Sequence, residues 1–219
     1  MEGKAVNKQK LQEAIGLNVN PNAPILFWPS RLDPMQKGCQ LFADILYQTV
    51  ADYSEIDLQV AIIANGSFQS HFENIVKLHG LEGRVAVVDF KEELSRLGYA
   101  GSDFMIMPSR FEPCGLPQMV SPKYGTLSVA HDTGGIHDTV EHLPQDCSHG
   151  NGFRFQHYSP EGLRWGINEA IGFFKRSHEE KEQVLSRIMQ ESASRFSHTT
   201  TAAAYIQRYE TMLGCKVGS

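Results

Sequence analysis

The residues best suited to chemistry lie in the stretch SRFEPCGL, residues 109–116. It places a carboxylate, Glu112, shortly before Gly115, and it follows the apolar run 103–108. That run lacks helical periodicity, so we predict a buried strand there and a helix over 116–124. Gly115 would then lie at a strand-to-helix turn, where backbone N–H groups can face an anion. A carboxylate beside an anion site is suited to bind the hydroxyl-rich end of the same ligand. A ligand with a phosphate at one end and hydroxyl groups at the other is a nucleotide sugar.

Two cations, Arg31 and Lys37, bracket a turn after an earlier predicted strand at 24–28. Two such groups can converge on a diphosphate, and a guanidinium can bind it through two parallel hydrogen bonds. An isolated pair of this kind is more often surface charge. The diphosphate interpretation therefore depends on the surrounding motif.

A second glycine turn, Thr133-Gly134-Gly135, precedes a predicted helix at 135–141. Close approach of the backbone to a ligand explains both glycines, and a simple connecting turn is the alternative. Phe90 follows a predicted strand at 84–89, where it could stack on a nucleotide base or pack in the core. Cys114 has no base near it in sequence, and buried packing is the interpretation we favour.

These turns need a sheet whose strands end on the same side. Apolar strand-like runs alternate with helical stretches along the chain, which predicts a doubly wound parallel sheet of about six strands with helices on both faces. Ligands bind such sheets beyond the carboxyl ends of the strands. From Pro160 onward we predict a helical cap. The strands are expected at 24–28, 58–64, 84–89, 103–108, 126–130 and 152–155.

Composition narrows the class of protein. The chain has 219 residues, 41% of them hydrophobic, and a net charge of −5, which suits one globular domain and disfavours nucleic acid as the main partner. Its four cysteines show no metal-ligand spacing, and no run is apolar enough for a membrane span. We expect a cytoplasmic protein, or a stromal one if it comes from a plant plastid.

Several motifs resemble those of one family in the same order. They are SRLDPMQKG (30–38), YAGSDFMIMPSRFEPCGL (99–116), KYGT (123–126), TGGIHDTV (133–140) and GNGFRF (150–155). They are similar to bacterial glycogen synthases and plant starch synthases, glycosyltransferase family 5, from about Lys4 to the C-terminus. The resemblance implies that residues 1–219 form the C-terminal, Rossmann-like half of a two-domain GT-B enzyme. The N-terminal acceptor domain would be a partner outside this chain.

The resemblance also implies roles for individual residues. Arg31 and Lys37 would stabilise the leaving diphosphate, and Glu112 would contact the donor glucose and support charge at its anomeric carbon. The reaction would transfer glucose, with retention, from ADP-glucose to the non-reducing end of an α-1,4-glucan, without a metal or other cofactor. The implied donor-binding residues are Phe90, Gly115, Leu116, Gln118, Thr133, Gly134 and Gly135.

The sequence departs from the family pattern at two places, and at a third it differs only from a wider group of glycosyltransferases. Asp33-Pro34-Met35 has one residue more than usual between SRL and QKG, which could shift Lys37. Pro117 stands where a threonine is usual, and it removes an N–H donor and a hydroxyl. Val120 stands where many related glycosyltransferases carry a second glutamate, so a single glutamate fits the glycogen and starch synthase branch.

Other functions remain as alternatives. The chain could belong to a GT-B enzyme with another sugar nucleotide or acceptor, or it could be a noncatalytic nucleotide- or glucan-binding module derived from one. A dinucleotide oxidoreductase is disfavoured, because no G-x-G-x-x-G follows the first predicted strand. We expect the chain alone to fold and to bind nucleotide weakly without transferring sugar.

Overall fold

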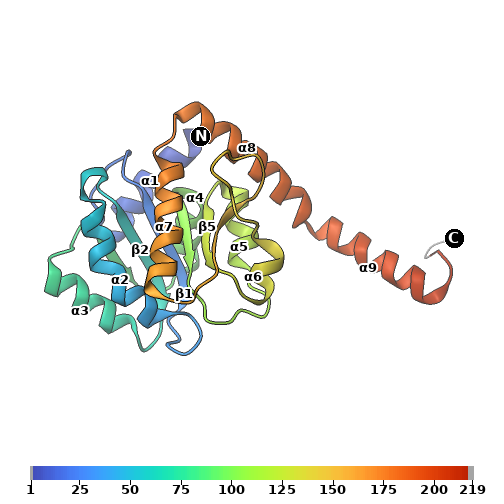
Figure 1. Cartoon of the computed structure of the whole chain (residues 1–219), viewed down its shortest axis with the longest axis horizontal. Helices are drawn as coiled ribbons and strands as arrows, with labels where there is room; N and C mark the ends of the chain where they lie inside the picture. The colour runs from blue at the N-terminus through green and yellow to red at the C-terminus, as the bar shows by residue number, and fades with distance from the viewer. Residues whose placement is uncertain (1, 217–219) are drawn as a thin grey trace.

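A six-stranded parallel sheet forms the centre of the computed structural model, which describes residues 2–216 (Figure 1). The spatial order of the strands is β3-β2-β1-β4-β5-β6, and every neighbouring pair is parallel. This confirms the α/β fold expected from the alternating pattern. The strands are β1 (Ile25–Arg31), β2 (Gln59–Asn65), β3 (Val85–Val88), β4 (Phe104–Met107), β5 (Leu127–His131) and β6 (Gly152–Phe155).

Helices cover both faces of this sheet, because the side chains of each buried strand alternate between the two faces. On β1, Leu26 and Trp28 pack with α2 (Cys39–Asp52), α3 (Gln69–His79), α7 (Pro160–Phe174) and α8 (His178–Arg195). Ile25 and Phe27 pack on the opposite face with α1 (Glu2–Ile15), α4 (Glu92–Gly101) and α6 (Gly134–Thr139). In Figure 1, α7 lies in front of the sheet and α1 behind it.

The order of the strands in the sheet determines where a ligand can bind. The strands β1, β2 and β3 run outward in one direction, and the chain then returns to place β4 on the other side of β1. The loops after β1 and β4 therefore diverge, and a crevice opens between them at the carboxyl ends of the strands. Arg31 ends β1, and the stretch SRFEPCGL follows β4.

The helix predicted after β4 differs from the sequence prediction in length and type. The helix expected over 116–124 is a single turn, α5 (Pro117–Val120), followed by a 3₁₀ turn, η2 (Ser121–Tyr124). Pro122 has no N–H and so cannot continue the α-helical hydrogen bonding. A further 3₁₀ turn, η1 (Ser54–Ile56), links α2 to β2.

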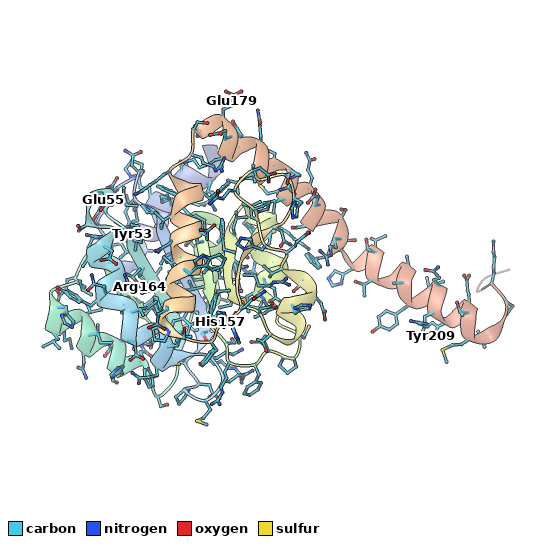
Figure 2. All side chains as sticks on the ribbon, viewed as in Figure 1. Tyr53, Glu55, His157, Arg164, Glu179 and Tyr209 are labelled. Carbon is cyan, nitrogen blue, oxygen red and sulfur yellow. The ribbon has the colours of Figure 1, made fainter. Side chains whose placement is uncertain are left out.

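The helical structure predicted from Pro160 onward is confirmed, and its last helix does not cover the sheet. Helices α7 and α8 do cover the sheet, and Leu185 and Ile188 of α8 are buried. Helix α9 (His198–Leu213) instead extends away from the sheet, with Tyr209 far from it in Figure 2. Its apolar residues find no surface on this domain, and none of the residues of α9 is buried. Among residues 2–216, no helix has the length and apolarity needed to cross a membrane.

Candidate donor-binding site

A cavity of about 390 Å³ lies at the carboxyl ends of β1, β2 and β4. Three residues that we predicted for a donor site, Arg31, Lys37 and Phe90, line it together. Arg31 ends β1, Lys37 lies in the loop that follows, and Phe90 follows β3, so the fold gathers groups that are up to 59 positions apart in the chain (31 to 90). Side chains that the sequence analysis did not assign complete the wall, among them Ser30, Asn65, Ser95, Tyr99, Ser109 and Pro117.

Glu112 joins this cavity through an ion pair. Lys37 Nζ lies 2.5 Å from Glu112 Oε2, and the two side chains are only 16% and 10% exposed. Ser109 Oγ donates a second hydrogen bond to the same carboxylate oxygen, at 3.3 Å. A cation and a carboxylate are thus held together at the edge of a cavity that also contains Arg31.

The loop between β1 and α2 brings Lys37 to this position despite its extra residue. The Asp33 carboxylate accepts hydrogen bonds from the backbone N–H groups of Met35 and Gln36, at 2.9 and 3.2 Å. The Lys37 N–H donates to the Asp33 carbonyl at 2.9 Å. These bonds form a local turn of the kind that aspartate favours. The turn accommodates the insertion, and Lys37 still reaches Glu112.

The second glycine turn packs directly against the Glu112 loop. The N–H of Gly135 donates to the carbonyl oxygen of Glu112 at 2.9 Å. A Cβ on Gly134, whose φ is +46°, would lie 2.2 Å from that same oxygen, and one on Gly135 would lie 2.2 Å from the carbonyl oxygen of Cys114. Both glycines are therefore required for this contact. Thr133 precedes them, half-buried, as the N-cap residue of α6.

The Gln118 side chain supports the turn at Gly115 through hydrogen bonds. Its side chain is fully buried, and its amide nitrogen donates to the carbonyl oxygens of Cys114 and Gly115, at 2.9 and 3.0 Å. Gly115 has a φ of +74°, and Leu116 is 67% exposed. The structure thus presents the backbone of 115–116 at the surface, with the Gln118 side chain turned inward to support it.

Phe90 is presented to the cavity by its neighbour on β2. Its N–H donates to Asn65 Oδ1 at 2.9 Å, and its ring is 46% exposed. The core alternative for Phe90 is therefore wrong. Cys114 is exposed as well, which corrects the expectation that it is buried. It lies in an open loop where no apolar partner covers it among the described contacts.

Two side chains that sequence reasoning missed support the site. His131 is buried at the end of β5, and its Nδ1 bonds the carbonyl oxygen of Ser109 at 2.8 Å. Tyr99 lines the cavity from α4, and burial raises its pKa to about 12. The position of His131 at a strand end is the signal that could have indicated it. In the described part of the chain, no cluster of His, Cys, Asp or Glu could hold a metal ion.

Known proteins with similar sequences point to one family. A family model described as glycosyl transferases group 1 matches residues 23–171. Glycogen synthase of Bacillus licheniformis is 34% identical over 214 residues, which cover 96% of this chain and 41% of that protein. Glycogen synthase of Exiguobacterium sibiricum is 37% identical, over 95% of this chain and 41% of that protein. The chain therefore spans about two fifths of the length of these relatives.

Solved structures agree with the sequence relatives. The catalytic domain of starch synthase IV from Arabidopsis thaliana, bound to ADP and acarbose, superposes with a TM-score of 0.77. It is 29% identical, and the match covers 95% of this chain and 42% of that one. HepE from Anabaena in complex with UDP has a TM-score of 0.71 at 22% identity, which shows a shared fold.

Proposed function

The chain belongs to the group 1 glycosyl transferases, and from that premise we propose that it is the donor-binding domain of a glycogen or starch synthase. The whole enzyme would transfer glucose from ADP-glucose to the non-reducing end of an α-1,4-glucan. The observation that carries this proposal is the Lys37–Glu112 ion pair beside the cavity that Arg31 lines. The site therefore combines two cations, Arg31 and Lys37, which can bind a diphosphate, with the Glu112 carboxylate, which can bind sugar hydroxyls.

Donor binding would exchange the partners of these groups. A diphosphate at the cavity would take Lys37 and Arg31 as counter-charges, since multiply charged oxygens attract both cations more strongly than one carboxylate does. Glu112 would then be free to accept hydrogen bonds from the glucose hydroxyls. Both side chains are largely shielded from water, so each remains paired before and after the exchange.

The chemical step breaks the bond between the anomeric carbon and the diphosphate oxygen. A new bond forms between that carbon and the 4-hydroxyl oxygen of the acceptor, on the same face, and the hydroxyl proton passes to the departing diphosphate. Arg31 and Lys37 would stabilise the charge on the leaving group, and Glu112 the positive charge at the anomeric carbon. We propose that these steps use no metal or other cofactor.

The turns around Glu112 would bind the rest of the donor. The exposed backbone at Gly115 and Leu116, supported by Gln118, faces outward beside the turn formed by Thr133, Gly134 and Gly135. We assign these turns to the phosphate and sugar. Phe90, at the far wall of the cavity, would then lie against the nucleotide base.

The partner of this domain would be the N-terminal half of the longer enzyme. Helix α9 carries exposed apolar side chains that have no place on this domain, which include Tyr205, Ile206, Tyr209, Met212 and Leu213. The relatives are more than twice the length of this chain. We propose that α9 packs on that second domain, whose surface completes the acceptor site. The reaction would take place in the cytoplasm, where nucleotide sugars are made.

Calorimetric titration with ADP-glucose, ADP and UDP-glucose tests this proposal. We expect the ADP ligands to bind more tightly than UDP-glucose, with a contribution from the sugar that Glu112→Ala removes. Equal affinity for ADP and ADP-glucose in the unchanged protein would contradict the role of Glu112. Preference for UDP-glucose would instead favour an enzyme with another donor, a possibility raised by Pro117 in the cavity wall. Adding the N-terminal half and measuring glucan synthesis separates an enzyme from a noncatalytic module.

A further inference from the structure

A second cavity, of about 620 Å³, lies at the opposite edge of the sheet from β3. It is formed between the edge strand β6 and helix α7, and we call it the Trp165 cavity. Its walls include His142, Arg154, Gln156, His157, Glu161 and Trp165. Among the described residues, it shares no lining residue with the donor cavity. Figure 2 labels His157, at the lower end of α7.

An exposed tryptophan forms one wall of this cavity. The chain has two tryptophans, and Trp28 is buried in the core, whereas Trp165 is 44% exposed. The His142 ring stacks on Trp165 with a centroid distance of 5.3 Å and an interplanar angle of 23°. The stack fixes the orientation of the indole, so a flat apolar surface is already in place before any ligand arrives.

Arg154, a polar residue of the same cavity wall, is also held in place. Arg154 donates to the carbonyl oxygen of His137 at 2.8 Å and pairs with Asp132 at 3.6 Å. A Cβ on Gly162 would lie 2.0 Å from the carbonyl oxygen of His157, so this glycine lets the loop before α7 pack closely on the helix. The cavity is therefore built from fixed elements on both sides.

The charges in the cavity offset one another. Arg154 contributes a cation and Glu161 a carboxylate, and burial lowers the pKa of His142, which leaves that ring uncharged at neutral pH. A polyanion finds no excess of positive charge here. A neutral ligand with an apolar face and many hydroxyl groups fits an aromatic wall edged by amide, carboxylate, imidazole and guanidinium groups. A pyranose ring has this chemistry.

We propose that the Trp165 cavity binds a segment of an α-glucan, at a site separate from the donor site. The CH face of one glucose unit would stack on Trp165, and its hydroxyls would bond to Gln156, Glu161 and Arg154. The choice of an α-glucan over other neutral saccharides rests on the proposed function. Such a site would keep the polymer bound to this domain between transfer steps.

The two indole N–H signals in a ¹⁵N NMR spectrum of the full chain provide the test. Titration with maltotetraose should shift the Trp165 signal in a saturable manner, with an affinity in the millimolar range, and should leave the Trp28 signal in place. Cellotetraose, which has the same composition with β-linkages, should shift it much less. No saturable shift of Trp165 with maltotetraose, or equal shifts with both sugars, would overturn the proposal.

Variants assign the effect to the cavity. Trp165→Ala removes one indole signal, which assigns the spectrum. Calorimetry should show maltotetraose affinity reduced about tenfold, which corresponds to a lost contribution of about 1.4 kcal/mol. Tyr47→Ala is the matched control, because Tyr47 is 45% exposed and also stacks on a histidine, His79, at 4.2 Å. It should bind maltotetraose like the unchanged protein, and a loss of affinity there would count against the site.

ADP binding separates this inference from the proposed function. Trp165→Ala should bind ADP with unchanged affinity, since Trp165 lies outside the donor cavity. Maltotetraose binding without ADP binding would leave the Trp165 cavity supported and the donor site refuted. ADP binding without a maltotetraose shift at Trp165 would refute only the glucan site. Trp165→Phe, which keeps an aromatic ring in the wall, also removes the Trp165 indole signal, so the titration can still be assigned if Trp165→Ala fails to fold.

Discussion

Lys37 Nζ lies 2.5 Å from Glu112 Oε2, so two residues that we assign to opposite ends of a donor form an ion pair with each other. They are 75 positions apart in the chain, on the loops after β1 and β4. The pair keeps both charged groups in place beside the cavity. It also means that a donor must displace one internal contact before it can bind.

This ion pair should contribute to stability in a coupled manner. Lys37→Met leaves the Glu112 carboxylate, which is 10% exposed, without its cation. We expect the free energy of unfolding to fall by about 1–3 kcal/mol. Glu112→Gln should also lower the free energy of unfolding. In the double variant the losses should sum to less than the two single losses, by about 1 kcal/mol. Urea unfolding of the four proteins measures this, and strictly additive losses would show that the pair is not coupled.

Gly134 should be intolerant of even a methyl group. Gly134→Ala places a Cβ 2.2 Å from the Glu112 carbonyl oxygen in a left-handed conformation, and we expect a stability loss of about 1–3 kcal/mol with weakened ADP binding. Gly172→Ala is the matched control: it adds the same methyl group inside α7, where nothing lies within 4 Å. That variant should be unchanged or up to about 1 kcal/mol more stable. Equal effects of the two variants would contradict the close packing at Gly134.

Lys4 should make stability rise with pH in the alkaline range. Burial lowers its pKa from 10.5 to about 8, while its Nζ donates to Thr126 Oγ1 at 2.9 Å. Between these two pH values the unfolded chain holds more protons than the folded one, so raising the pH stabilises the fold. The difference in unfolding free energy between the unchanged protein and Lys4→Met should shift by about 1–3 kcal/mol from pH 8 to pH 10.5, in favour of the unchanged protein. Parallel pH profiles would refute this.

Removing residues 198–219 should leave the domain folded. The described side chains of α9 are largely exposed, so we expect the unfolding free energy to change by no more than about 0.5 kcal/mol. Ile188→Ala on α8 gives the contrast, because Ile188 is fully buried and its truncation should cost about 2–4 kcal/mol. A large loss on removing α9 would mean that this helix packs on the domain in solution.

Much of the fold could be predicted from the sequence because its signals are local. Buried parallel strands appear as apolar runs, and glycines at 115, 134 and 135 mark turns whose backbone geometry other residues cannot adopt or fit. The alternation of strands and helices then implies the doubly wound sheet. Arg31 and Glu112 were identifiable for the same reason, since each follows a predicted strand, and Lys37 was identifiable from the motif SRLDPMQKG.

The tertiary structure decided what depends on contacts between distant segments. The burial of Gln118 beneath the glycine turn and the stacking of His142 on Trp165 have no local sequence signal. The position of His131 at a strand end does not reveal that its ring bonds Ser109. Sequence analysis predicted only that the chain is helical from Pro160 onward, and the packing showed that the side chains of α9 do not join the core of this domain. The sequence thus determined which residues end strands and begin turns. Which of them meet, and with what charge and burial, followed only from the packing of the sheet, because those energies arise between groups far apart in the chain.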